Sequence, residues 1–483
     1  MNRVFTKQSK WCILTVLFFS VPFLACGQYI KKAQLEDDLK EFERLLFTLH
    51  PGLDYFTDTL TLRNLFVEKK ANLPDSLDRI SFFNHIEPII GNIRCGHTNL
   101  AIANKLFKKP EDKKKKLFFP ALMYPWDGRL FFQTDFKHEW LTIPKGTELI
   151  SIDSVPSAEI IHQISKTHKG ADGQDFGSET AWSVAGFRTT YNRFFGRRAN
   201  YKIVVRKPGK QEIDLYTLKG ISYESIAKER KENKRSPLSY EFIEGGQVAV
   251  IKLTSFSNES FFKRNKKLFK EAFKEIKEKN VQNLIIDLRN NGGGAIVNCN
   301  HFLSYLLEEE FTIVKRASLN KHLNKKDLIT FQKVLIATRK KELTSDEIWL
   351  KKYNRKAKKI NKQYRYDGKL VVLTNKRSYS ASTMFCAKLK SEKRGVIMGE
   401  VPGGSYHISF AGYSKYFTMK NSKIRIRIPL MRMEYDVDSD LQDNMIPVQP
   451  DIIKAVTEKD LIDDTHDSLK QDAIEYLLNG KSM

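Results

Sequence analysis

Three serines lie within a short segment, RSYSASTMF at residues 377–385, directly after the apolar run GKLVVLTN. A strand that turns sharply into a helix exposes a serine hydroxyl at the positive end of the helix, where acyl-transfer enzymes place their nucleophile. Serine is also common at helix starts because its oxygen caps free backbone N–H groups. The segment alone therefore leaves two interpretations open, a nucleophile and a helix cap.

A glycine loop follows a second apolar run in the segment IIDLRNNGGG, residues 285–294. Glycines allow the backbone to approach a ligand closely, with N–H groups directed outward at the start of a helix. The loop lacks the lysine and the hydroxyl residue of a phosphate-binding P-loop. It suits an oxyanion hole, which needs preorganised donors rather than a full charge. The alternative is a tight turn without chemistry.

His97, in RCGHTNL, lies between a helical stripe and strand-like residues. A lone histidine is usually structural, but one at such a junction can project into a cleft as a general base. A histidine, a glycine loop and a serine at a helix start are together the components of acyl transfer.

The elements that would position these residues form three regions. Apolar residues with helical spacing run from about 31 to 107, and short strand-like runs separated by turn residues occupy 118–218. From residue 247 onward strands and helices alternate, which predicts an α/β fold with largely parallel central strands. Because parallel strands end at one edge of a sheet, the glycines of GEVPGGSYH at 399–407 are expected on the same edge as NNGGG.

The composition is that of a folded chain. Of 483 residues, 41% are hydrophobic and 29% are charged, and the length suits two or three domains. The net charge of +25 is scattered over helix-like segments, with one dense run at 108–117, so no nucleic-acid interface is predicted. Cys95, Cys299 and Cys386 have no metal-ligand spacing, and neither a metal nor a cofactor is predicted.

Residues 1–27 have the pattern of an export signal, with basic residues followed by the apolar stretch WCILTVLFFSVPFLA. Cleavage after ACG would begin the mature chain at Gln28. Lipidation of Cys26 is the alternative and would associate the protein with a membrane. We therefore predict an exported protein, periplasmic or extracellular.

IIDLRNNGGG, VVLTNKRSYSAS, VIMGEVPGGS and IPVQPDI resemble, in order and spacing, the C-terminal-processing and tricorn-core serine peptidase family. The segment GTELISIDSVPSAEI similarly resembles part of a PDZ-like module. The resemblance implies a ClpP/crotonase-like layered core with parallel strands, preceded by a small helical domain and a PDZ-like, mostly-β module. The expected divisions are a signal at 1–27, a helical domain at 28–110, the PDZ-like module at 118–218, the core at 240–456 with an insertion at 316–366, and a C-terminal helix at 457–483.

The resemblance also implies roles for single residues. Ser380 matches the family's nucleophile, Ser378 and Ser382 become supporting or capping residues, and the backbone N–H groups of Ala381 and Gly293 become the oxyanion donors. The lysine that processing peptidases pair with their serine falls at Ser405.

This departure favours the tricorn-like branch of the family, in which a histidine activates the serine and an acidic residue near the C-terminus completes the relay. His97 matches the histidine, and Asp443 is our choice for the acid, with Asp440 and Glu434 as alternatives. We therefore predict an exported serine endopeptidase that acts on peptides or proteins. The alternative is an inactive relative that binds peptides or a hydrophobic ligand in the same cleft. The sequence leaves the oligomeric state open.

Overall fold

The computed structural model describes residues 29–102, 117–138, 140–167, 172–173, 186–232, 236–257, 259–320, 322, 346–354, 361–438, 447–463 and 465–480. The predicted signal, Cys26 and all but the last residue of the lysine-rich run at 108–117 lie outside these ranges. Within them, no helix combines the length and the apolar character needed to cross a membrane.

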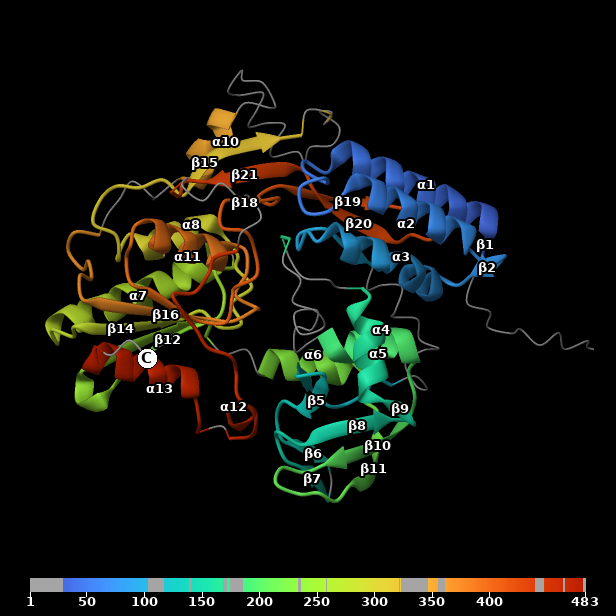
Figure 1. Ribbon diagram of the computed structural model, residues 1–483, viewed down its shortest axis with the longest axis horizontal. Helices are drawn as coiled ribbons and strands as arrows, with labels where there is room; N and C mark the ends of the chain where they lie inside the picture. The colour runs from blue at the N-terminus through green and yellow to red at the C-terminus, as the bar shows by residue number, and fades with distance from the viewer. Residues whose placement is uncertain are drawn as a thin grey trace, which may run out of the picture.

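A six-stranded sheet forms the centre of the fold, in the order β12-β13-β14-β16-β17-β22 (Figure 1). Every neighbouring pair from β13 to β22 is parallel, and β12 joins the edge in antiparallel fashion. This confirms the predicted α/β core with parallel strands. The strands are β12 (Leu238–Ile243), β13 (Val248–Leu253), β14 (Asn283–Asp287), β16 (Lys369–Thr374), β17 (Val396–Gly399) and β22 (Ile452–Ile453), and the 3-10 turn η4 (Glu244–Gly246) joins the first two.

Helices cover both faces of the central sheet, which explains why its strands are continuous apolar runs. Alternate strand residues point to opposite faces. Ile251 and Ile286 share a core with α7 (Glu259–Glu278), α8 (Ile296–Leu303) and α11 (Ala381–Ser391). Val250 and Ile285 pack on the opposite face against α13 (Ser468–Asn479). Figure 1 shows α13 on the side of the sheet opposite α8 and α11.

Three N-terminal helices lie beside this core: α1 (Lys32–Leu49), α2 (Thr59–Ala71) and α3 (Arg79–Ile93). Asp58 and Asp78 cap the second and third by accepting backbone N–H groups of the first turn. The buried stripe of α1 packs in one continuous cluster with the core and with β20 (Arg425–Pro429). That strand lies between β19 (Ser414–Thr418) and β3 (Asn99–Ala101), and β1 (Ile30–Lys31) pairs with β2 (Ser76–Leu77).

A second sheet, with its own hydrophobic cluster, occupies the region where short strands were predicted. Its strands run in the order β11-β10-β8-β5-β4, with β9 paired to β8, and a separate hairpin joins β6 to β7. The elements are β4 (Met123–Trp126), β5 (Arg129–Phe132), β6 (Phe136–His138), β7 (Leu141–Ile143), β8 (Glu148–Ile152), β9 (Val155–Pro156), α4 (Ser157–Ser165), α5 (Gly186–Phe195), β10 (Asn200–Arg206), β11 (Asp214–Lys219) and α6 (Tyr223–Glu232). We call this region the β module.

The remaining elements extend the core. A three-stranded sheet joins β15 (Val314–Leu319), β21 (Met431–Tyr435) and β18 (Ile408–Ser409), and α10 (Asp346–Tyr353) packs near it. Trp349 of α10 is buried in the main cluster, so this described part of the predicted insertion packs against the core. The C-terminal region contains two helices rather than one, α12 (Glu458–Ile462) and α13.

Loops from three neighbouring parallel strands meet at one edge of the central sheet. The Ser378 hydroxyl, after β16, donates to the Leu288 carbonyl after β14 at 2.8 Å. The Gly403 N–H, after β17, donates to the Ser378 carbonyl at 2.8 Å. The expectation that the two glycine loops share an edge with the serine segment is thus confirmed.

Candidate active site

Ser380 occupies the turn between β16 and α11 in a strained conformation. Its φ of 59° and ψ of −114° place it at positive φ, where non-glycine residues are uncommon. It is the residue that precedes α11, yet its side chain makes no capping hydrogen bond. The hydroxyl therefore lies at the start of the helix and does not accept a hydrogen bond from the N–H groups of its first turn.

Asn291 holds the glycine loop against the serine turn. Its carbonyl accepts the Tyr379 N–H at 3.0 Å and the Ser382 hydroxyl at 2.9 Å. Its side chain donates to the Leu253 carbonyl at 2.8 Å and accepts the Gly293 N–H at 2.9 Å. Ser382 is thus a buried residue that joins two loops, which is the supporting role of the two expected for it and not the capping one.

His97 lies in the turn between α3 and β3 and reaches Ser380. Its Nε2 is 3.2 Å from the Ser380 Oγ, which is hydrogen-bond distance. Only 8% of His97 is exposed, and this burial lowers its pKa to about 3, with a further decrease from the positive charge of Arg427. The imidazole is therefore neutral at neutral pH and can accept the serine proton.

The other ring nitrogen of His97 contacts Tyr379, which in turn bonds Asp172, and the sequence did not predict either residue. The Tyr379 hydroxyl is 2.8 Å from Nδ1 and donates to the Asp172 carboxylate at 3.0 Å. Asp172 is 1% exposed and also accepts the Gly96 N–H at 3.3 Å. Burial raises the pKa of Asp172 to about 7, although these two hydrogen bonds oppose the increase.

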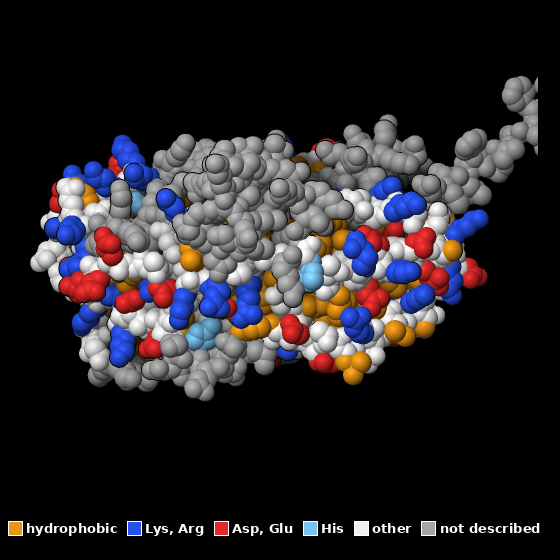
Figure 2. All heavy atoms as spheres, turned by 90° about the horizontal axis from the view of Figure 1, so that it is seen from above, with side chains coloured by type: hydrophobic (Ala, Val, Ile, Leu, Met, Phe, Trp, Pro, Cys, Tyr) orange, Lys and Arg blue, Asp and Glu red, His pale blue; other side chains and the backbone are white. Residues whose placement is uncertain are grey.

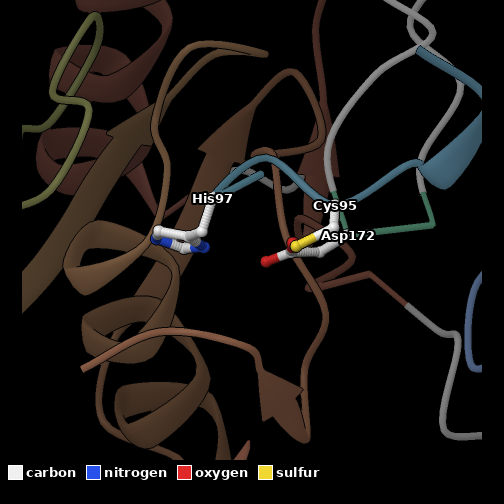
Figure 3. A group of neighbouring side chains, drawn as sticks. All are labelled: Cys95, His97 and Asp172. Atoms are coloured by element: carbon white, nitrogen blue, oxygen red, sulfur yellow. The ribbon is translucent and has the colours of Figure 1, made fainter. Parts of the chain in front are cut away.

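Cys95, His97 and Asp172 are the described residues grouped closely enough to hold a metal ion (Figure 3). One ligand atom of each lies within 4.8 Å of the others. However, the Tyr379 hydroxyl already bridges His97 and Asp172, so a metal ion would have to displace it. Burial, reinforced by Asp172, raises the pKa of Cys95 to about 12, which keeps the thiol protonated.

The two predicted oxyanion donors differ in their surroundings. The Ala381 N–H begins α11 and has no acceptor among the residues that the structure describes. The Gly293 N–H, in contrast, donates to the Asn291 side chain. Gly293 nevertheless lies directly against the serine turn, because a Cβ added there would be 2.8 Å from the Ser380 Cβ.

Of the three predicted acids, Glu434 alone lies among the described residues. Asp443 and Asp440 lie outside the described residues. Glu434 lies on β21, where it pairs with Arg316 at 3.6 Å and Arg432 at 3.1 Å, and within the described chain no contact joins it to His97. Ser405, at the position of the family's lysine, is buried and accepts the His407 N–H at 3.3 Å.

Comparison with known proteins places this site in context. Residues 247–453 match the model of peptidase family S41. The tail-specific protease of Haemophilus influenzae is 26% identical over 204 residues, which cover 41% of this chain and 24% of that protein. The matched segment thus spans about a quarter of the relative's length.

Solved structures resemble the chain over nearly its whole length. Mature CPAF, alone and complexed with lactacystin, aligns with a TM-score of 0.60 at 14% identity, covering 94% and 93% of this chain and 99% of that one. This likeness concerns the fold. His97 and Asp172 both lie before the segment that matches the family model.

Proposed function

Because residues 247–453 carry a peptidase family S41 domain, we propose that this protein is a serine peptidase with Ser380 as nucleophile and His97 as general base. The observation that carries the proposal is the 3.2 Å separation of the Ser380 Oγ and the His97 Nε2. The strained backbone of Ser380 supports it, since such strain gathers at functional sites.

In the proposed reaction His97 accepts the hydroxyl proton while the Ser380 oxygen attacks the carbonyl carbon of a peptide bond. The carbonyl oxygen gains negative charge, which the Ala381 N–H and the positive end of α11 stabilise. The imidazolium then donates its proton to the departing amine, leaving an acyl-enzyme. Water, deprotonated by His97, hydrolyses the ester and restores Ser380.

We further propose that the β module binds the substrate chain near the serine. β4 is the last strand of its sheet and carries Tyr124, whose ring lies 5.1 Å from the Arg377 guanidinium beside the serine turn. The Trp126 indole of the same strand donates to the Val456 carbonyl at 3.1 Å. An extended peptide added to this edge would be guided toward Ser380 in a PDZ-like manner.

The signal-like pattern at residues 1–27 supports export, to the periplasm or outside the cell. Mass spectrometry of the protein recovered from its host distinguishes a cleaved N-terminus from a lipidated one. A mature N-terminus at Gln28 supports cleavage, a diacylglyceryl mass on Cys26 supports a membrane-anchored form, and retention of residues 1–27 contradicts export.

The catalytic proposal is tested with a fluorophosphonate probe, in which serine displaces fluoride and becomes phosphonylated. We expect labelling of the wild type on Ser380, none in Ser380→Ala, and strongly slowed labelling in His97→Ala. Ser391→Ala, at the opposite end of α11, is the control and should label normally. The rate of hydrolysis of an unfolded protein such as casein should be highest in the wild type and Ser391→Ala, strongly reduced in His97→Ala and absent in Ser380→Ala.

Casein hydrolysis that is equal in the wild type and Ser380→Ala would refute the assignment. Complete absence of labelling and hydrolysis would favour a non-catalytic relative that binds peptides in the same cleft.

A further inference from the structure

We propose that Tyr379 and Asp172 form a positioning pair that holds His97 in the one tautomer able to deprotonate Ser380. The geometry of two consecutive hydrogen bonds carries this inference, from the His97 Nδ1 to the Tyr379 hydroxyl and from that hydroxyl to Asp172. The inference rests on the proposed function, because positioning matters only if His97 is the base.

The direction of each hydrogen bond follows from counting protons. A neutral histidine has one N–H, and Nε2 must be unprotonated to accept the Ser380 proton. Nδ1 then carries the hydrogen and donates to the Tyr379 oxygen, which leaves the single tyrosine proton for Asp172. In this arrangement each donor has an acceptor, and the carboxylate is the final one.

Asp172 is the residue that selects this direction. Without it, the Tyr379 hydroxyl could donate to Nδ1, and His97 would then carry its hydrogen on Nε2, facing Ser380. That tautomer is a donor to the serine and cannot act as its base. Above its pKa of about 7, Asp172 is ionised and accepts hydrogen bonds without donating, so it keeps the tyrosine proton away from His97.

The pair also stabilises the charge that His97 gains during the reaction. The ring is 8% exposed, so an imidazolium there receives little help from water. A hydrogen bond from Nδ1 to a phenol that is itself bonded to a carboxylate is polarised toward the positive ring. Tyr379 and Asp172 would thus perform the task that the sequence analysis assigned to Asp443.

Hydrogen bonds between residues 172–173 and the turn after α3 hold Asp172 in position. The Gly173 N–H donates to the Arg94 carbonyl at 3.1 Å, and the Arg94 guanidinium donates to the Gly173 carbonyl. The Gly96 N–H donates to the Asp172 carboxylate at 3.3 Å. These hydrogen bonds therefore keep Asp172 beside the turn that carries His97.

The kinetic test compares Tyr379→Phe, Asp172→Asn and the double variant with the wild type. Because a general base contributes about 10²- to 10⁴-fold, we expect each single variant to lower kcat by about 10²-fold with little change in KM. The double variant should be no slower than the slower single variant, since both substitutions interrupt the same two consecutive hydrogen bonds from His97 to Asp172. Tyr435→Phe, another buried tyrosine close to Asp172, is the control and should retain wild-type kcat.

Nitrogen NMR of ¹⁵N-histidine-labelled protein supplies a second measurement, which does not need activity. We expect His97 protonated on Nδ1 in the wild type and in Tyr435→Phe, and a shift toward the Nε2–H tautomer in Asp172→Asn. An unchanged tautomer in Asp172→Asn, or an unchanged kcat in both single variants of a folded and active enzyme, would overturn the proposal.

These measurements separate the two proposals. A wild type without any Ser380-dependent hydrolysis refutes the proposed function, and the NMR result still decides whether Tyr379 and Asp172 set the tautomer.

Discussion

Replacing Gly293 by alanine should slow the reaction at Ser380 even in protein that remains folded. Gly293 has a φ of +89°, and a Cβ there would be 2.5 Å from the Tyr379 carbonyl oxygen, 2.7 Å from the Ala381 nitrogen and 2.8 Å from the Ser380 Cβ. All three contacts belong to the turn that carries the proposed nucleophile and its oxyanion donor. The new methyl group therefore displaces the reacting groups themselves.

The size of the effect follows from these distances. Ordinary contacts of a Cβ begin near 3.4 Å, so the Tyr379 carbonyl must retreat by about 0.9 Å, close to the displacement of about 1 Å that costs about 10²-fold in rate. The left-handed backbone of an alanine costs about 1–2 kcal/mol of stability, and the contacts of its Cβ with backbone atoms add about 1–3 kcal/mol. We thus expect fluorophosphonate labelling to slow by about 100-fold, while the free energy of unfolding falls by about 2–5 kcal/mol.

Gly292→Ala is the matched control. Gly292 precedes Gly293 in the same loop, its φ is not positive, and nothing lies within 4 Å of an added Cβ. A small probe should therefore label this variant at the wild-type rate. The reasoning fails if Gly293→Ala, shown to be folded by urea denaturation, labels Ser380 as fast as Gly292→Ala does.

Two further predictions concern buried ion pairs. Arg289 bonds the carboxylates of Asp287 and Asp467, and Arg289→Met should lower the free energy of urea unfolding by about 3–5 kcal/mol, because Asp287 is left buried without its closest counter-charge. Arg289→Lys keeps the positive charge, so it should lose less stability than Arg289→Met does. An equal loss of stability in both variants would contradict the role of this charge. Burial raises the pKa of Glu87, beside Arg193, from 4.5 to about 7. Between pH 4.5 and 7, Glu87 is therefore protonated in the folded state and ionised in the unfolded state. Wild-type stability should therefore fall relative to Glu87→Gln as the pH rises from 4.5 to 7, and a constant difference would refute this.

Much of the site was predictable because its signals are local. The apolar runs before residues 288 and 375 are the buried strands β14 and β16, and the glycines after the first run form the loop that faces the serine turn. Parallel strands place their carboxyl ends at one edge, which is why the order of motifs predicted that these loops meet. The turn with His97 was found for the same reason, since it lies where a helix ends and a strand begins.

The partners of His97 were not predictable, because tertiary contacts alone create them. Asp172 is 207 residues from Tyr379 in the sequence, and its surroundings, KGADGQDFG, read only as turn residues. For a related reason, the sequence could not decide between the supporting and the capping role of Ser382. Serine at a helix start normally caps the helix, but here the close approach of two loops gives its hydroxyl a carbonyl acceptor on Asn291.

The proposed active site therefore depends on contacts among three regions more than on any one of them. The serine comes from the turn after β16 of the central sheet and the histidine from the turn after the N-terminal helices. Asp172 lies in sequence between α4 and α5 of the β module. The positive φ of Ser380 costs free energy, and the bonds from Asn291 to the serine turn offset it. Because loop contacts are weaker than the packed core beneath them, variants that loosen these contacts should lose activity before they lose the fold.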